Sequence, residues 1–150
     1  MRIVQDNLSR VTGINSFKIS TRQLCPMYLA SASAGFPSPA DDFVEQSLDL
    51  NEFLIKHPSA TFFVRVAGDS MLGAGIHDGD ILIVDKALEA HDGSIVIAAL
   101  DGEFTVKRLK KSDGRVWLVP ENPQFFPIEI EEGRDFDIWG VVTNVIHPAM

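Results

Sequence analysis

The sequence predicts a mostly β protein, in which a β-sandwich or partly open barrel follows a flexible N-terminal arm. Two observations lead to this prediction. From Thr61 onward, short runs rich in Val, Ile and aromatic residues recur, and Gly-containing turn signals separate them. Residues 1–34, in contrast, are polar and mixed and sustain no apolar period. The 150 residues are enough for one domain with a substantial core.

The arm comes first in the chain, and the first part of residues 1–34 can pair with a sheet edge. Pro37 and Pro39 then fix an extended path. Capping signals at residues 41–45 predict a short helix, and residues 51–56 are a second helical candidate. Strands are predicted at residues 62–66, 81–85, 94–100, 103–109, 115–119, 126–130 and 136–146.

Charge and motif content argue against direct, sequence-specific DNA binding. The net charge is −8, which opposes extensive contact with phosphates. Basic residues gather only in the short segment 107–111, which is too small to form a basic face. Residues 1–60 show no helix-turn-helix pattern, and the 34 residues of the arm are too few to hold one.

The sequence also indicates a cytoplasmic protein without a metal or cofactor. No apolar run approaches the length of about 18 residues that spans a bilayer, and the first residues lack the features of a secretory signal. A single cysteine, Cys25, excludes an internal disulfide framework and fits a reducing compartment. The four histidines are scattered, and no HxxxH or CxxC spacing suggests a zinc site.

Ser70 lies at the break between two predicted strands within Thr61–Asp85. A hydroxyl at the end of a strand can face a cleft while neighbouring backbone N–H groups point at an incoming carbonyl oxygen. A serine after Gly-Asp is also common in plain turns, so Ser70 alone leaves both interpretations open. A Ser–His–Asp triad would need a histidine beside Ser70, and the nearest in sequence, His77, is seven residues away in a glycine turn.

Lys107 lies in the middle of a predicted strand that comes after the hairpin signal Asp101-Gly102. Alternation places it on one face with Thr105 and Leu109. Most strand lysines are surface residues. A desolvated lysine would instead have a pKa below its reference of about 10.4. Its neutral amine could then accept the proton of a serine hydroxyl, so a Ser–Lys dyad needs no histidine.

These stretches together resemble the LexA/UmuD family of self-cleaving Ser–Lys proteins. The matching segments are VAGDSM (66–71), DGDILIVD (78–85), GSIVIAALDGEFTVKRL (93–109) and VPEN (119–122). Upstream, ASAGFPSPADDFVEQSLDLNEFLIKHPSAT (32–61) resembles the UmuD branch in particular. The resemblance covers about residues 30–147, and the 37-residue spacing of Ser70 and Lys107 suits the family.

The resemblance implies a fold like the LexA C-terminal domain and a catalytic dyad of Ser70 as nucleophile and Lys107 as base. The implied self-cleavage bond is Ala34-Gly35, although Ala-Gly-x-Pro is also a routine linker sequence. Cleavage there would divide the chain into an arm, residues 1–34, and a peptidase-like body, residues 35–150. The backbone N–H groups of Asp69 and Ser70 are the candidate oxyanion donors.

The family also implies partners. A RecA filament on single-stranded DNA would stimulate cleavage, and the trimmed homodimer would join an error-prone Y-family translesion polymerase in the SOS response. Pro26, Met27 and Tyr28 could contact the replication sliding clamp, or they could simply dock the arm. The alternative function is a non-catalytic regulatory or polymerase-accessory dimer with an idle Ser–Lys pair. Signal peptidases share the chemistry but need a membrane anchor, which this sequence does not show.

Overall fold

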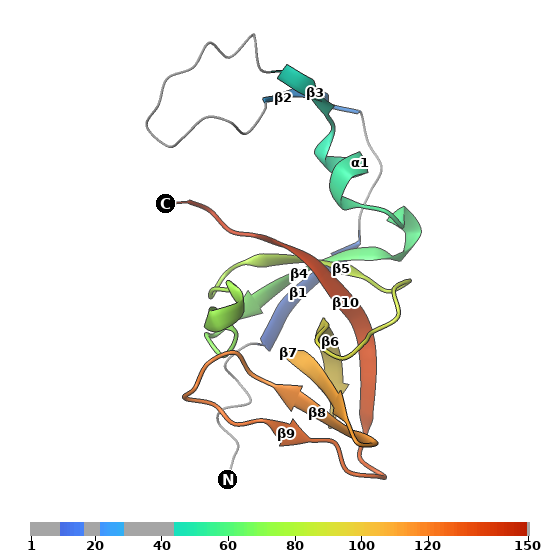
Figure 1. The fold of residues 1–150 in the computed structure, drawn as a ribbon, viewed down its shortest axis with the longest axis vertical. Helices are drawn as coiled ribbons and strands as arrows, with labels where there is room; N and C mark the ends of the chain where they lie inside the picture. Colours follow the sequence, from blue (N-terminus) through green and yellow to red (C-terminus); the bar gives the residue numbers. More distant parts are fainter. Residues whose placement is uncertain (1–9, 17–21, 29–43, 150) are drawn as a thin grey trace. The chain divides into compact units, whose positions relative to one another are not determined.

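The computed structural model of the chain describes residues 10–16, 22–28 and 44–149 (Figure 1). The chain divides into two compact units, one of Met1–Phe17 with Ser59–Met150 and one of Lys18–Pro58. The predicted cleavage bond, Ala34-Gly35, lies outside the described residues.

The larger unit is built on one antiparallel eight-stranded sheet in the order β1-β4-β5-β10-β6-β7-β8-β9. The first strand also pairs with β7, where Arg10 lies opposite Thr105. The sheet therefore curls towards a partly open barrel, and the prediction of a mostly β fold is confirmed (Figure 1). Its strands are β1 (Arg10–Ser16), β4 (Thr61–Ala67), β5 (Ile81–Asp85), β6 (Ile95–Leu100), β7 (Glu103–Ser112), β8 (Arg115–Val119), β9 (Ile128–Glu129) and β10 (Phe136–Ile146).

Two Asp-Gly pairs make the tight turns that set the register of β7. Asp101-Gly102 joins β6 to β7, and Asp113-Gly114 joins β7 to β8. All four residues have positive φ, as the favoured two-residue hairpin turn requires. In the register that results, Lys107 lies opposite Val96. The turn sequence therefore determines where along the sheet the Lys107 side chain emerges.

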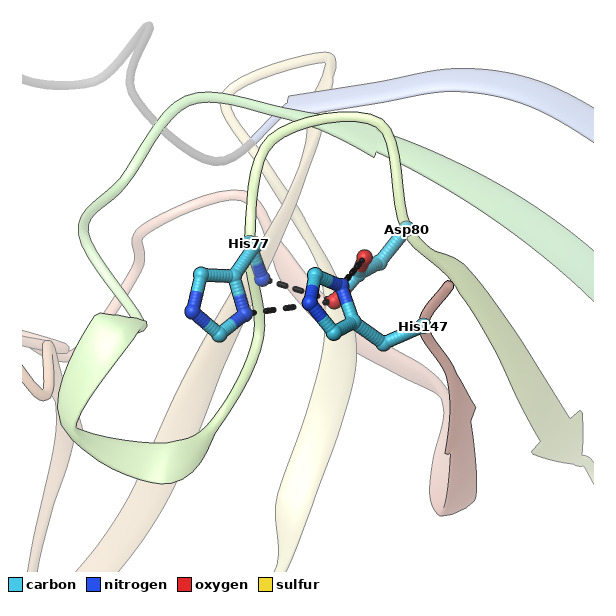
Figure 2. Close-up of side chains that lie close together, drawn as sticks. All are labelled: His77, Asp80 and His147. Atoms are coloured by element: carbon cyan, nitrogen blue, oxygen red, sulfur yellow. Dashed lines mark hydrogen bonds and ion pairs between the residues drawn. The ribbon is translucent and has the colours of Figure 1, made fainter. Parts of the chain in front are cut away.

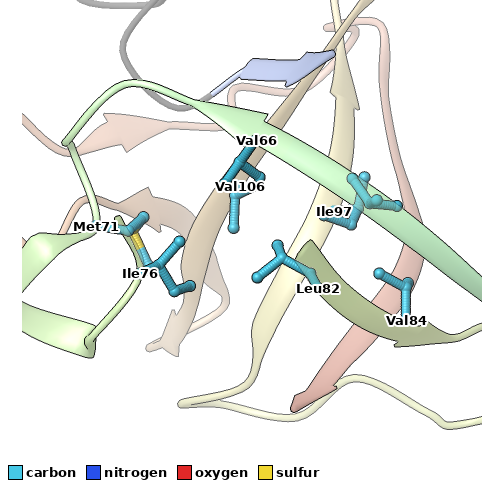
Figure 3. Packing of buried hydrophobic residues seen from close by; sticks show 8 residues of the cluster. Val66, Met71, Ile76, Leu82, Val84, Ile97 and Val106 are labelled. Carbon is cyan, nitrogen blue, oxygen red and sulfur yellow. The ribbon is translucent and has the colours of Figure 1, made fainter. Parts of the chain in front are cut away.

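The core lies inside the curled sheet (Figure 3). Met71 and Ile76 join it from the segment between β4 and β5, and both are almost fully buried. Burying a side chain of this size contributes about 1.5–3 kcal/mol. Met71 therefore anchors the loop that carries Ser70. The other buried members of this cluster are Val64, Val66, Leu82, Val84, Ile97 and Val106.

The smaller unit contains a hairpin-like strand pair and a short helix. The strand β2 (Cys25–Tyr28) pairs antiparallel with β3 (Val44–Leu48). The helix α1 (Leu50–Leu54) comes next, and the side chain of Asp49 caps it by accepting the N–H of Asn51 at 3.1 Å. The second predicted helix is thus present, beginning one residue earlier than expected.

Two predicted elements differ from the structure. The prediction of a helix at residues 41–45 is wrong for residues 44–45, which the structure describes as the start of β3. Pairing of β3 with β2 overrides the local capping signals. The strand predicted at residues 126–130 is reduced to Ile128–Glu129, since Pro127 has no N–H to donate to a neighbouring strand. Two 3-10 turns, Pro58–Ala60 and Leu72–Ala74, complete the described elements. None of the described helices is both long enough and apolar enough to cross a membrane.

Candidate Ser–Lys active site

Ser70 lies in the loop that begins where β4 ends. Gly68 turns the chain with φ of +97°, a conformation that favours glycine. The carboxylate of Asp78 holds this turn by accepting the N–H of Gly68 at 2.8 Å. The 3-10 turn Leu72–Ala74 then leads the chain away, and Ser70 between them is fully buried.

A second segment, Glu121-Asn122, clamps the Ser70 loop. The N–H of Glu121 donates to the carbonyl of Ser70 at 2.8 Å, and Asn122 Nδ2 donates to the carbonyl of Asp69 at 2.9 Å. In return, the N–H of Gly73 donates to the carbonyl of Glu121 at 2.7 Å. A Cβ on Gly73 would lie 2.7 Å from that same oxygen, so only glycine allows this approach. The loop is therefore fixed on both sides of Ser70.

Glu121 is itself held by Arg108, whose Nε donates to Glu121 Oε1. The same guanidinium donates to the carbonyl of Gly93 at 2.6 Å. Arg108 comes directly after Lys107 on β7, so one strand supplies both the lysine and the support for the clamp. Sequence reasoning assigned no role to Glu121 and Asn122 beyond their place in the VPEN segment, because contacts across about 50 residues leave no local pattern.

Lys107 points into the protein and reaches Ser70. Its side chain is buried, with 3% of the residue exposed. Lys107 Nζ lies within hydrogen-bond distance of three oxygens: Ser70 Oγ at 3.3 Å, Thr105 Oγ1 at 2.7 Å and the carbonyl oxygen of Val106 at 3.1 Å. The interpretation of Lys107 as a surface lysine is therefore wrong. Thr105, which shares its strand face, was not singled out from the sequence as a site residue.

A cavity lies beside Lys107, and, among the residues that the structure describes, unpaired backbone N–H groups lie at Ser70. A cavity of about 110 Å³ adjoins the lysine, and Thr105 and Lys107 contribute to its wall with Leu100, Asp101, Glu103, Phe104, Ile128 and Arg134. Asp101 and Arg134 form an ion pair at 2.8 Å at this cavity. Within the described part of the chain, the N–H groups of Asp69 and Ser70 donate to no protein acceptor.

The other predicted site residues lie elsewhere or outside the residues that the structure describes. Pro26 is exposed in β2. The side chains of Met27 and Tyr28 lie outside what the structure describes. Ala34 and Gly35 lie outside it too. His77 contacts Asp80 and His147, and none of the histidines that the structure describes bonds to Ser70 (Figure 2). A Ser–His–Asp triad is therefore not formed there.

Comparison with known proteins identifies the family of the chain. Residues 26–143 match the family described as Peptidase S24-like. The chain is 51% identical over 122 residues to Protein SamA of Salmonella typhimurium strain LT2, covering 81% of this chain and 84% of SamA.

Two further relatives extend the comparison. Protein MucA of Escherichia coli is 49% identical over 127 residues, which cover 83% of this chain and 86% of MucA. The LexA repressor of Ectopseudomonas mendocina is 44% identical over 119 residues, which cover 79% of this chain and 58% of the repressor. The match therefore extends from the arm-side segment through both segments that carry Ser70 and Lys107, and the chain belongs to the Peptidase S24-like family.

Proposed function

We propose that this protein is a self-cleaving serine peptidase of the SOS response, in which Ser70 and Lys107 cut the chain between Ala34 and Gly35. The observation that carries the proposal is the 3.3 Å separation of Lys107 Nζ and Ser70 Oγ in a buried site. Membership of the Peptidase S24-like family supports it independently.

Lys107 acts as the general base in its neutral form. Burial disfavours the charged ammonium and so lowers the pKa of the amine. A neutral amine has two N–H donors and one lone pair. Thr105 Oγ1 and the carbonyl of Val106 lie where they can accept these N–H groups, and Ser70 Oγ lies within reach of the lone pair. The contacts around Nζ therefore suit a base without a histidine.

The reaction proceeds through an acyl-enzyme. Ser70 Oγ attacks the carbonyl carbon of Ala34 while Lys107 takes the hydroxyl proton, and the N–H groups of Asp69 and Ser70 stabilise the oxyanion. Lys107 then gives its proton to the amine of Gly35 as the peptide bond breaks. Water hydrolyses the ester and regenerates the Ser70 hydroxyl, leaving a body of residues 35–150. The small side chain of Ala34 suits the cavity of about 110 Å³ beside Lys107.

The biological setting is inferred from the resemblance to UmuD-like proteins. A RecA filament on single-stranded DNA stimulates cleavage by favouring the docked arm. The trimmed homodimer, residues 35–150, serves a Y-family translesion polymerase in the cytoplasm. Before cleavage, Pro26-Met27-Tyr28 of the arm either contacts the sliding clamp or docks the arm. The identity of about half of all aligned residues with SamA and MucA supports this assignment to the UmuD-like branch.

The test is the intact mass of the purified chain after incubation with RecA, single-stranded DNA and a nucleotide, and separately at alkaline pH. A product with the mass of residues 35–150 is expected from the unaltered chain. Ser70→Ala and Lys107→Ala should give none, while circular dichroism shows that both variants fold. Lys110→Ala is the matched control, because Lys110 is an exposed lysine on the same strand. Cleavage that persists in Ser70→Ala would rule out the proposed nucleophile.

The complete burial of Ser70 favours a second function, that of a non-catalytic accessory dimer. A fully buried nucleophile can reach its substrate only after the surrounding residues move, whereas a non-catalytic Ser–Lys pair requires no such movement. In that case no fragment forms under either condition, and the unaltered chain and Ser70→Ala support polymerase activity equally. A fragment that depends on Ser70 excludes this alternative.

A further inference from the structure

Two histidines and a buried carboxylate meet on the larger unit (Figure 2). His77 and Asp80 lie in the turn before β5, and His147 comes directly after the end of β10. One ligand atom from each of the three residues can be chosen so that all lie within 4.8 Å of one another. Because His147 is 67 residues from Asp80, sequence spacing could not reveal this cluster.

The carboxylate of Asp80 is held in a fixed orientation. Its side chain is 1% exposed, and its Oδ2 accepts the backbone N–H of His77 at 2.8 Å. The N–H of Asp80 donates to the carbonyl of His77 at 3.0 Å, and its own carbonyl accepts the N–H of Val66 at 3.1 Å. These bonds direct the other oxygen, Oδ1, at His147 Nδ1, which lies 2.6 Å away. Hydrogen bonds of this kind orient the ligands in protein metal sites.

The two imidazole rings are exposed and adjustable. The side chains of His77 and His147 are 47% and 46% exposed, and their rings stack with centroids 4.3 Å apart. His77 Nδ1 lies 3.7 Å from Asp80 Oδ2. Ligand atoms around tetrahedral zinc are about 3.3 Å apart, given bond lengths of about 2.0–2.1 Å. His147 Nδ1 lies 2.6 Å from Asp80 Oδ1, whereas His77 Nδ1 lies 3.7 Å from the other oxygen, Oδ2. One chosen ligand atom from each residue lies within 4.8 Å of the others, so rotation of the two exposed rings is needed to bring both nitrogens and one carboxylate oxygen around a single ion.

From this geometry we infer that His77, Asp80 and His147 form a binding site for a divalent transition-metal ion such as Zn²⁺. Two imidazoles and one carboxylate are the donors that such ions prefer, and three protein ligands leave a fourth position for water. Exposed rings give the ion a path from solvent, and the buried carboxylate supplies a negative charge. The site is independent of the proposed cleavage chemistry.

Binding at this site would join two distant parts of the chain. The ion would tie the segment after β10 to the turn between β4 and β5, which belongs to the same loop region as Ser70. A ligand that binds only the folded state stabilises it. Zn²⁺ should therefore raise the melting temperature of the unaltered protein.

The test is Zn²⁺ titration by calorimetry at neutral to slightly alkaline pH, on protein that carries no histidine tag and has been treated with a chelator. We expect one ion per chain, and a loss of affinity of at least tenfold in both His77→Ala and His147→Ala. His91→Ala is the matched control, because His91 is exposed and outside the cluster, and its affinity should not change. Each variant is first checked for folding by circular dichroism.

Co²⁺ provides a second readout, since its visible absorption reports the number and geometry of its ligands. The unaltered protein and His91→Ala should give the intense bands of a tetrahedral site, and His147→Ala should lose them. The inference is overturned if the unaltered chain binds no ion. It is equally overturned if His77→Ala and His147→Ala bind as well as the unaltered chain, or if His91→Ala loses the same affinity.

Discussion

The hydroxyl of Thr105 lies 2.7 Å from the Lys107 amine, and its removal tests whether this contact positions the proposed base. Thr105→Val replaces this hydroxyl with a methyl group of similar size in a position that is 8% exposed. The change removes the 2.7 Å hydrogen bond from Lys107 Nζ and leaves the shape of the site intact. Loss of one buried hydrogen bond to such a group costs about 1–3 kcal/mol.

If that bond orients the amine towards Ser70, the cost appears in the rate of cleavage. At about 1.4 kcal/mol for each factor of ten, cleavage should slow by about 5- to 150-fold. The pH profile should change as well. The ammonium gives up a stronger hydrogen bond than the neutral amine does, so the variant lowers the pKa of Lys107 further. In the proposed mechanism cleavage rises with pH as Lys107 loses its proton, and this rise should move to lower pH in Thr105→Val.

The assay is the appearance of the 35–150 fragment by intact mass across a series of alkaline pH values. Thr105→Ser retains the hydroxyl and should restore both the rate and the profile. Thr143→Val is the control, because this threonine of β10 donates to the carbonyl of Ile83 and is not part of the Ser–Lys pair. An unchanged rate and profile in Thr105→Val would refute the positioning of Lys107 by Thr105.

Two further changes test the clamp on the Ser70 loop. Asn122→Ala removes the hydrogen bond to the carbonyl of Asp69. It should lower the free energy of unfolding by about 1 kcal/mol, measured by urea denaturation, and slow cleavage in the fragment assay. Unchanged cleavage would contradict the clamp. Gly73→Ala places a Cβ 2.7 Å from the carbonyl oxygen of Glu121 and should destabilise by about 1–3 kcal/mol, so an unchanged urea midpoint would show that the contact is not tight.

The strands after residue 60 could be predicted from the sequence because local signals and tertiary pairing agree there. Asp101-Gly102 and Asp113-Gly114 adopt the positive φ values that their residue types favour, and the flanking runs are β-branched. At Val44–Leu48 the two sources disagree, because capping residues favour a helix while β2 offers a pairing partner. A local pattern cannot show which of these interactions is stronger.

The site shows the same limit. Alternation along β7 placed Lys107 on one face with Thr105, but it could not show that this face is the buried one at Lys107. The resemblance supplied the pairing with Ser70. Neither route found the contacts of Asn122 with Asp69 or of His147 with Asp80, since each joins segments more than 50 residues apart.

The strand β1 would be held differently once the chain is cut. This strand connects β4 to β7: it pairs with β4 from Arg10 to Ser16 and with β7 at Thr105. A cut at Ala34-Gly35 would leave β1 attached to the body by hydrogen bonds and packing alone. Its return after each departure would then be bimolecular, without the high effective concentration that a covalent tether provides. Dilution would thus favour the loss of β1, which would separate β4 from β7 beside Thr105. The exposed backbone of β4 could then pair with another strand.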